Sequence, residues 1–128
     1  MKLLLDTHVL LWAAGQPEKL KPTAQAMLLD PANDLFFSPV SLWEIAIKRA
    51  LDRPGFRADP RRLWRMLLAN GYRELPVTGE HAVAVDALPP LHKDPFDRML
   101  LAQARAEGLD LLTTDDALAR YGEGIHRI

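Results

Sequence analysis

Residues 2–7 read KLLLDT, and this short stretch decides the fold class. Its apolar run is too brief for a helix, and such a run is typical of a central parallel strand that is buried on both faces. We therefore predict a first strand over Lys2–Leu5, with Asp6 at its carboxyl end. Thr7 is then expected to cap a helix that runs to about Ala14.

The rest of the chain alternates short apolar runs with helical patterns that begin at capping residues. Further strands are predicted over residues 35–37, 74–77, 109–113 and 125–128, and helices over residues 22–30, 38–50, 59–71, 81–88, 94–107 and 115–121. Strands that alternate with helices predict an α/β fold, with a mostly parallel central sheet and helices on both of its faces.

Length and composition describe a globular chain. Its 128 residues suit one domain over residues 1–128, and contents of 48% apolar and 26% charged residues exclude disorder as the main state. The 16 basic and 17 acidic residues give a net charge of -1, which excludes a protein that holds a polyanion by bulk charge alone. Because the chain has no cysteine, disulfides, thiolate-ligated metals and a cysteine nucleophile are excluded.

The N-terminal region contains the longest unbroken apolar run, Val9–Gly15. This run is far shorter than the roughly 18 residues that a membrane span requires. Asp6 also interrupts what would otherwise read as the apolar part of a signal peptide. We therefore expect a soluble and complete chain in the reducing cytoplasm, with no membrane partner.

Four acidic residues are expected to converge on one cleft. Asp6 and Asp115 each follow a strand, and in parallel sheets the functional cleft forms at the carboxyl ends of the strands. Asp97 lies in the first turn of a helix and Glu44 near the start of another. Clustered carboxylates stay ionised only when a cation neutralises them, and oxygen ligands without cysteine or paired histidines indicate Mg²⁺ or Mn²⁺. The chemistry that follows is metal-dependent phosphoryl transfer.

Each of these acids also fits a purely structural role. Asp94, Asp97 and Asp115 stand where helix N-caps occur. Glu44 lies among apolar neighbours, where an intrahelical ion pair with Lys48 would satisfy its charge. A non-catalytic binding module, whose acids only cap helices and form ion pairs, therefore stays open.

Four segments together carry a family resemblance: LLLDTHVLLW, SPVSLWEIAIK, HKDPFDRMLLAQA and LLTTD. In order and spacing they resemble the PIN-domain nucleases, most closely the VapC-type toxins of bacterial toxin–antitoxin pairs. The resemblance covers nearly the whole chain. It implies a three-layer α/β/α sandwich and a Mg²⁺- or Mn²⁺-dependent endoribonuclease that cleaves RNA, forms a homodimer and is silenced by a small antitoxin protein.

The resemblance also implies roles for individual residues. The catalytic acids would be Asp6, Glu44, Asp97 and Asp115, with metal ligands among them at Asp6, Asp97 and Asp115, and with support from the Thr113 hydroxyl and from Asp94. Asp116 is expected to be solvated. A PIN nuclease of RNA maturation or decay, which would have no antitoxin, is the alternative within the family.

Residues 48–65 hold seven basic and two acidic side chains, a local charge of +5. Arg57, Arg61 and Arg62 in this basic stretch are candidates for contacts to an RNA backbone, because phosphates are usually bound by Arg and Lys. A solvated helix surface and a docking strip for an acidic partner remain open as alternatives.

Histidine and tryptophan residues receive structural interpretations. The four histidines lack ligand spacing, which argues against zinc. His92 alone lies beside the acidic loop, where it is expected to pack on Pro90, with contact to a phosphate as the alternative. Trp12, Trp43 and Trp64 recur at helical spacing with Leu and Ile. We expect them in the core or in an interface rather than stacked on bases.

Overall fold

The computed structural model describes residues 1–128 and contains a five-stranded sheet in the order β3-β2-β1-β4-β5, in which every neighbouring pair is parallel. The strands are β1 (Lys2–Leu5), β2 (Asp34–Phe37), β3 (Arg73–Glu74), β4 (Asp110–Thr113) and β5 (Ile125–Arg127). β1 lies at the centre, where Leu3 is opposite Leu35 of β2 and Asp110 of β4. The predicted parallel α/β fold is confirmed.

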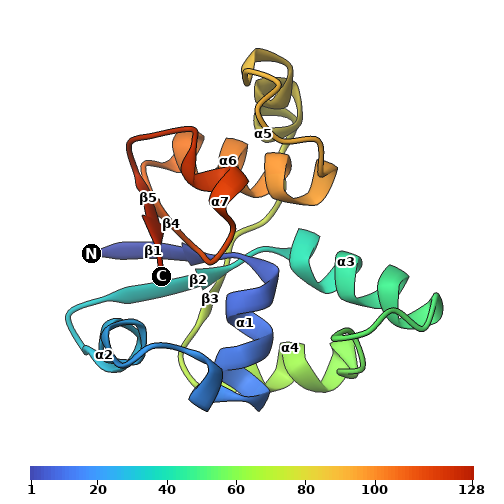
Figure 1. Cartoon of the computed structure of the whole chain (residues 1–128), viewed down its shortest axis with the longest axis vertical. Coiled ribbons are helices and arrows are strands. Elements are labelled where there is room, and N and C mark those ends of the chain that lie inside the picture. The colour runs from blue at the N-terminus through green and yellow to red at the C-terminus, as the bar shows by residue number, and fades with distance from the viewer.

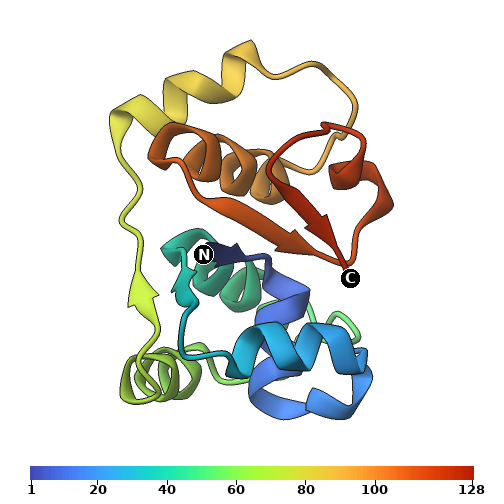
Figure 2. The same ribbon diagram turned by 90° about the vertical axis from the view of Figure 1, so that its left-hand side faces the viewer.

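Helices cover both faces of this sheet. They are α1 (Thr7–Gly15), α2 (Pro22–Leu29), α3 (Pro39–Ala50), α4 (Pro60–Ala69), α5 (Gly79–Ala84), α6 (Pro95–Glu107) and α7 (Asp116–Ala119). Figures 1 and 2 show α1, α2 and α4 on one side and α5, α6 and α7 on the other, while α3 extends from the carboxyl end of β2. The sheet is thus the middle of three layers. No helix combines the length and apolar character that crossing a membrane requires.

Alternate side chains of β1 enter opposite layers of the core. Leu3 and Leu5 are fully buried in a cluster with residues of α1, α3 and α4, whereas Leu4 is fully buried in a second cluster with residues of α6 and α7. This alternation follows from the period of two in a strand. Because β1 is held from both sides, the backbone at its carboxyl end, where Asp6 follows, is held as well.

Three helices begin with the same local signal, a capping residue followed by proline. The side chains of Ser38, Asp59 and Asp94 accept backbone N–H groups in the first turns of α3, α4 and α6. The following proline has no N–H that would need a partner there. Gly108 is the C-cap of α6, and its φ of 68° lies in the left-handed region that glycine adopts without strain.

The third strand is shorter than predicted. A strand over residues 74–77 is wrong in its extent, because β3 covers only Arg73–Glu74. The Leu75 N–H still donates to the Phe37 carbonyl at 2.8 Å. Pro76 has no N–H and cannot continue the ladder, so the strand ends before it.

The cap of the first helix also differs from the prediction. Asp6, rather than Thr7, is the N-cap of α1, and its Oδ1 accepts the N–H of Val9 at 2.9 Å. Thr7 is instead the first residue of the helix, and its hydroxyl donates to Glu44 in α3. Because Asp6 already occupies the N-cap position, the Thr7 hydroxyl is free to bond the buried carboxylate.

Two later helices are shorter than predicted. The helix predicted over residues 81–88 is α-helical only over Gly79–Ala84 and continues as a 3₁₀ turn over Val85–Ala87. The Arg98 guanidinium donates to the Val85 carbonyl, which therefore has a partner outside the helix. The helix predicted over residues 115–121 is α7, which ends at Ala119.

Two of the tryptophans lie at the surface. Trp43 in α3 is 61% exposed and Trp64 in α4 is 40% exposed, so core burial is wrong for both. Trp43 packs edge-on against Phe96, while Trp12 packs against the core cluster on the α1 side of the sheet. Apolar surface of this kind is compatible with a protein interface.

Candidate active site

A polar cavity of about 270 Å³ lies beyond the carboxyl ends of β1 and β4, next to α3 and α6. No apolar side chain lines it. Its lining consists of Asp6, His8, Glu44, Lys48, His92, Asp94, Asp97, Thr114 and Asp115. The structure therefore brings the four predicted catalytic acids together, although they come from four separate parts of the chain.

Asp6 is buried at the end of β1 and has a partner for each carboxylate oxygen. Oδ1 accepts the N–H of Val9, and Oδ2 accepts the hydroxyl of Thr113, the last residue of β4. Burial raises the pKa of the Asp6 carboxyl above its usual range. The Thr113 oxygen also accepts the backbone N–H of Asp115 at 3.0 Å, so this one hydroxyl orients two of the predicted metal ligands.

Glu44 is only 2% exposed in α3 and has two polar partners. Its Oε1 accepts the Thr7 hydroxyl at 2.6 Å, and its Oε2 pairs with Lys48 Nζ at 2.5 Å. The Ser41 hydroxyl lies 3.0 Å from that of Thr7 and extends this polar group. The intrahelical ion pair is present, yet both of its members still line the cavity.

Asp94 and Asp97 occupy the start of α6. Asp94 is the N-cap, and its Oδ1 accepts the N–H groups of Phe96 and Asp97 at 2.8 and 3.1 Å. Burial, with a further contribution from the charge of Asp94, raises the pKa of Asp97 to about 7. Asp94 thus caps the helix that presents Asp97 to the cavity and adds to its negative potential.

Asp115 is both a helix cap and a cavity residue. Its Oδ1 accepts the N–H of Ala117 at 2.7 Å at the start of α7, while its Oδ2 lies 3.2 Å from His92 Nε2. The neighbouring Asp116 does not line the cavity, has a side chain that is 78% exposed, and pairs with Arg127. The expected solvation of Asp116 therefore agrees with the structure.

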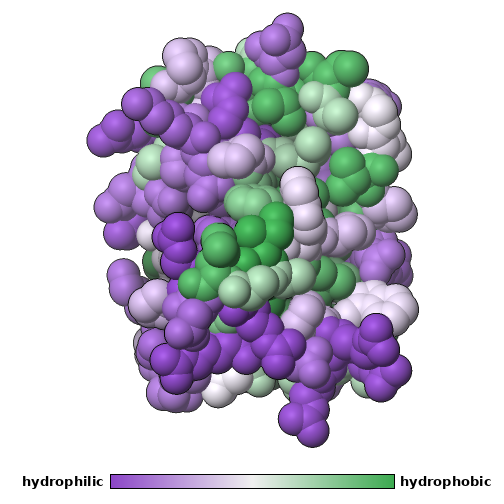
Figure 3. Space-filling view, turned by 90° about the vertical axis from the view of Figure 1, so that its right-hand side faces the viewer, coloured by the Kyte–Doolittle hydropathy of each residue, from purple (hydrophilic) through white to green (hydrophobic).

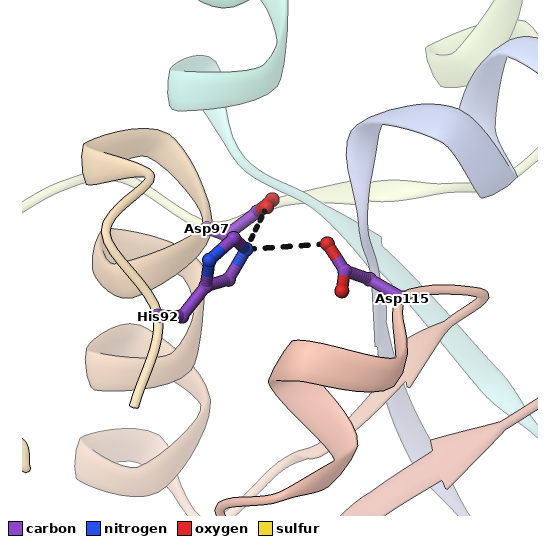
Figure 4. Close-up of side chains that lie close together, drawn as sticks. All are labelled: His92, Asp97 and Asp115. Carbon is purple, nitrogen blue, oxygen red and sulfur yellow. Dashed lines mark hydrogen bonds and ion pairs between the residues drawn. The ribbon is translucent and has the colours of Figure 1, made fainter. Parts of the chain in front are cut away.

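His92 is a site residue for which the sequence interpretation preferred a structural role. It was expected to pack on Pro90, but its Nε2 lies 2.9 Å from Asp97 Oδ2 and 3.2 Å from Asp115 Oδ2. Figure 4 shows this one ring nitrogen directed toward both carboxylates. The sequence signal for a site role of His92 was its place in the loop beside the D-P-F-D segment. The conformation of that loop places the ring in the cavity, and no local sequence pattern predicts this conformation.

The donor set fits a divalent cation. His92, Asp97 and Asp115 each offer one ligand atom, and these atoms lie within 4.8 Å of one another. The raised pKa values of Asp6 and Asp97 show that ionised carboxylates are disfavoured in this buried cluster without added positive charge. A divalent ion would supply that charge and would favour the ionised forms.

The basic stretch of residues 48–65 lies mostly outside the cavity. Arg57, Arg61 and Arg62 are exposed, and they are absent from the cavity lining; only Lys48 of this stretch reaches it. Figure 3 shows the side of the molecule to which α3 extends, where hydrophilic surface surrounds a central apolar patch.

Comparison with known proteins identifies the family. A model of the PIN domain matches residues 3–124. Ribonuclease VapC22 of Mycobacterium tuberculosis (strain ATCC 25618 / H37Rv) is 32% identical over 120 residues, which cover 93% of this chain and 91% of that protein.

Solved structures share the fold at low sequence identity. The VapBC2 complex from Rickettsia felis bound to a promoter DNA fragment gives a TM-score of 0.72 at 15% identity and covers 99% of this chain and 98% of the matched chain. VapC20 from Mycobacterium tuberculosis, a toxin that cleaves the sarcin–ricin loop, gives a TM-score of 0.64 at 18% identity. This match covers 94% of the present chain and 95% of the VapC20 chain. With the family match over nearly the whole chain, these results show that the protein belongs to the PIN-domain family as a homologue of the VapC ribonuclease toxins.

Proposed function

We propose that this protein is an endoribonuclease that hydrolyses RNA phosphodiester bonds at the polar cavity, with Mg²⁺ or Mn²⁺ held by Asp6, Asp97 and Asp115. The observation that carries the proposal is the convergence of four acids from β1, α3, α6 and the end of β4 on one cavity without apolar lining. The bound ion would neutralise charge on the attacked phosphate and activate water for in-line attack.

The other side chains of the cavity hold these ligands in place. Thr113 donates to Asp6 and accepts from the backbone of Asp115, so it fixes two ligands relative to each other. Glu44 is anchored by Thr7 and Lys48 and contributes negative charge to the lining of the cavity. Such fixed geometry lowers the cost of organising the site when substrate arrives.

A binding module whose acids only cap helices accounts for less of the geometry. In Asp6 and Asp115 the capping oxygen is Oδ1, and Oδ2 is directed to Thr113 or His92. Asp97 is not a cap at all, since Asp94 caps α6. Capping therefore accounts for one oxygen of Asp6, one oxygen of Asp115 and neither oxygen of Asp97.

The cellular role proposed here is that of the toxin in a VapBC-type module. The 32% identity to ribonuclease VapC22 over 93% of the chain supports a toxin over a PIN nuclease of RNA maturation or decay. The solved neighbours include toxin–antitoxin complexes, such as one from Klebsiella pneumoniae with a TM-score of 0.62 and 20% identity, covering 98% of this chain and 99% of that one. A short partner gene next to the coding sequence would agree with this role, and its absence would favour the alternative.

Apolar surface supports protein partners, namely an antitoxin and a second copy of this chain. One hollow of about 410 Å³ lies among residues of α1, α2 and α4, and another of about 600 Å³ includes Trp43, Val77 and Met99. Exposed apolar patches mark interaction sites in soluble proteins. The homodimer, the cytoplasmic location and a single domain over residues 1–128 stay predictions, and light scattering of the purified protein tests the dimer.

The direct test of the function is incubation of the purified protein with total RNA. We expect cleavage with Mg²⁺ or Mn²⁺ and none with EDTA. A preparation of the double variant Asp6→Asn, Asp97→Asn, purified in parallel, controls for contaminating nuclease. Full cleavage by this variant would contradict the proposed mechanism.

A further inference from the structure

We propose that His92 supplies a nitrogen ligand to the divalent ion of this cavity, and that it makes the site prefer Mn²⁺ to Mg²⁺. This inference rests on the proposed function, because it requires an ion held by Asp97 and Asp115. The proposed site differs from an all-carboxylate site because a histidine determines which metal ion it prefers.

The first support is the spacing of three ligand atoms. His92 Nε2 is 2.9 Å from Asp97 Oδ2 and 3.2 Å from Asp115 Oδ2. Adjacent ligands of an octahedral ion with bonds of about 2.1 Å lie roughly 3 Å apart. The imidazole nitrogen and the two carboxylate oxygens are therefore already spaced as neighbouring ligands, and they come from a loop, from α6 and from the end of β4.

The second support is the way the backbone of His92 is held. Its N–H donates to the Tyr121 hydroxyl at 3.1 Å, and its carbonyl accepts from Arg98 Nη1 at 3.3 Å. Tyr121 and Arg98 also donate to the Pro89 carbonyl, at 2.7 and 3.1 Å. One tyrosine and one arginine thus tie the loop before α6 to the body of the protein on both sides of His92.

The surroundings of the ring agree with a fixed ligand. The His92 side chain is 16% exposed, close to the 15% of Asp97. A ligand whose loop is fixed before the ion arrives needs little reorganisation to bind it. Arg98 and Tyr121 act here as positioning residues, because they hold His92 and do not line the cavity themselves.

The preference for Mn²⁺ follows from the chemistry of the donor atom. Mg²⁺ is a hard ion that takes oxygen ligands and retains much of its water. Transition-metal ions accept imidazole nitrogen more readily, so one such ligand among carboxylates shifts the balance toward Mn²⁺.

A competing arrangement has the ring fill the ion's position and leave when the ion binds. In that case His92 would compete with the metal, and its removal would strengthen binding. The two arrangements therefore predict opposite changes in affinity for a variant that lacks the ring.

The experiment uses the full chain, stripped of metal with EDTA and titrated with Mn²⁺ or Mg²⁺ by calorimetry. Electron–nuclear double resonance of the Mn²⁺ complex adds a readout of directly bound nitrogen. We expect a ¹⁴N coupling in the natural protein and its loss in His92→Ala. Mn²⁺ affinity should fall by roughly 10–100-fold in the variant, and Mg²⁺ affinity by a clearly smaller factor.

His8 offers a matched control, because it lines the same cavity from α1 but forms no ion pair with a carboxylate there. His8→Ala should keep the ¹⁴N coupling and the Mn²⁺ affinity. His92→Gln, which retains length and hydrogen-bonding groups, serves if His92→Ala does not fold, and it should also lose the coupling.

Two results would overturn the inference while leaving the proposed metal site intact. One is Mn²⁺ binding by the natural protein without a ¹⁴N coupling, and the other is unchanged or tighter Mn²⁺ binding by His92→Ala. Failure of the natural protein to bind either ion would instead overturn the metal site, and with it both proposals.

Discussion

The polar cavity and the basic stretch of residues 48–65 are both strongly charged, but they are built differently. The cavity gathers its acids from four separate elements, and Asp6, Glu44 and Asp97 are largely buried there. The basic stretch is contiguous in sequence, and its arginines are exposed. Charged groups that tertiary structure brings together, despite the cost of desolvation, indicate a catalytic or binding site. Charged groups that are neighbours in sequence and stay solvated need no such function.

The same difference between the cavity and the basic stretch is seen in the pKa shifts of two helix caps, Asp6 and Asp59. Asp6 caps α1 in the cavity, and burial raises its pKa. Asp59 caps α4 in the basic stretch, and hydrogen bonds from the N–H groups of Arg62 and Arg61 lower its pKa. Capping alone favours the ionised form. The raised pKa of Asp6 therefore reflects its place in the cavity and not its role as a cap.

The largest expected effect is on RNA cleavage by variants of the four acids. Asp6→Asn, Glu44→Gln, Asp97→Asn and Asp115→Asn keep side-chain size but remove charge, so each should lower the cleavage rate by about 100-fold or more. Effects of double variants should be less than additive, because the groups act around one ion. Initial rates on a labelled RNA at saturating metal measure this.

Asp116→Asn is the internal control and should cleave at nearly the normal rate, since Asp116 is exposed and does not line the cavity. If this variant lost as much activity as the variants of the four acids, negative charge near α7 would determine the cleavage rate, rather than the geometry of the cavity.

A smaller effect is expected in the basic stretch. If Arg57, Arg61 and Arg62 contact the RNA backbone, replacing all three with Gln weakens binding across RNA sequences. It also lowers the slope of log K against log salt by about 0.7 per lost contact with single-stranded RNA. Binding titrations with catalytically inactive protein at several salt concentrations measure the slope. An unchanged slope would assign these arginines to solvent or to a protein partner.

The pH dependence of stability should further distinguish the cavity from the basic stretch. The pKa of Asp97 is raised in the folded protein from 3.8 to about 7, so between these values the folded state binds more protons than the unfolded state. Metal-free protein should therefore lose stability as pH rises from about 4 to about 7. Melting temperatures in EDTA at pH 5 and pH 7.5 measure a fall of roughly a few degrees. Asp97→Asn should show a smaller fall, and an equal fall would place the titrating group elsewhere.

Much of the fold could be predicted from the sequence because its signals are local. The strand Lys2–Leu5 and the helices that begin at Ser38 and Asp94 depend on a short apolar run or on a cap followed by proline. The meeting of Asp6 with Asp115 then follows from a general rule about parallel strands. Glu44 was identifiable because an acid among apolar residues needs a partner.

The remaining site contacts depend on tertiary placement and have no local pattern. Thr7 reaches Glu44 only because α1 and α3 pack together, and His92 enters the cavity only because Arg98 and Tyr121 hold its loop. Helical spacing likewise indicates a shared face but not whether another element covers that face. For this reason the core placement expected for Trp43 and Trp64 is wrong, whereas their placement in an interface stays a prediction.

The central claim is that the buried acids, and not the basic stretch, bind the divalent ion in the folded state. Melting temperature with and without Mn²⁺ or Mg²⁺ tests it directly and is insensitive to contaminating nuclease. At a metal concentration 100 times the Kd, binding to the folded state alone stabilises by about 2.7 kcal/mol. The account predicts a rise of several degrees in the natural protein, a similar rise when Arg57, Arg61 and Arg62 are all replaced with Gln, and none in Asp6→Asn, Asp97→Asn. No rise in the natural protein with either ion, or an undiminished rise in the double variant, would contradict it.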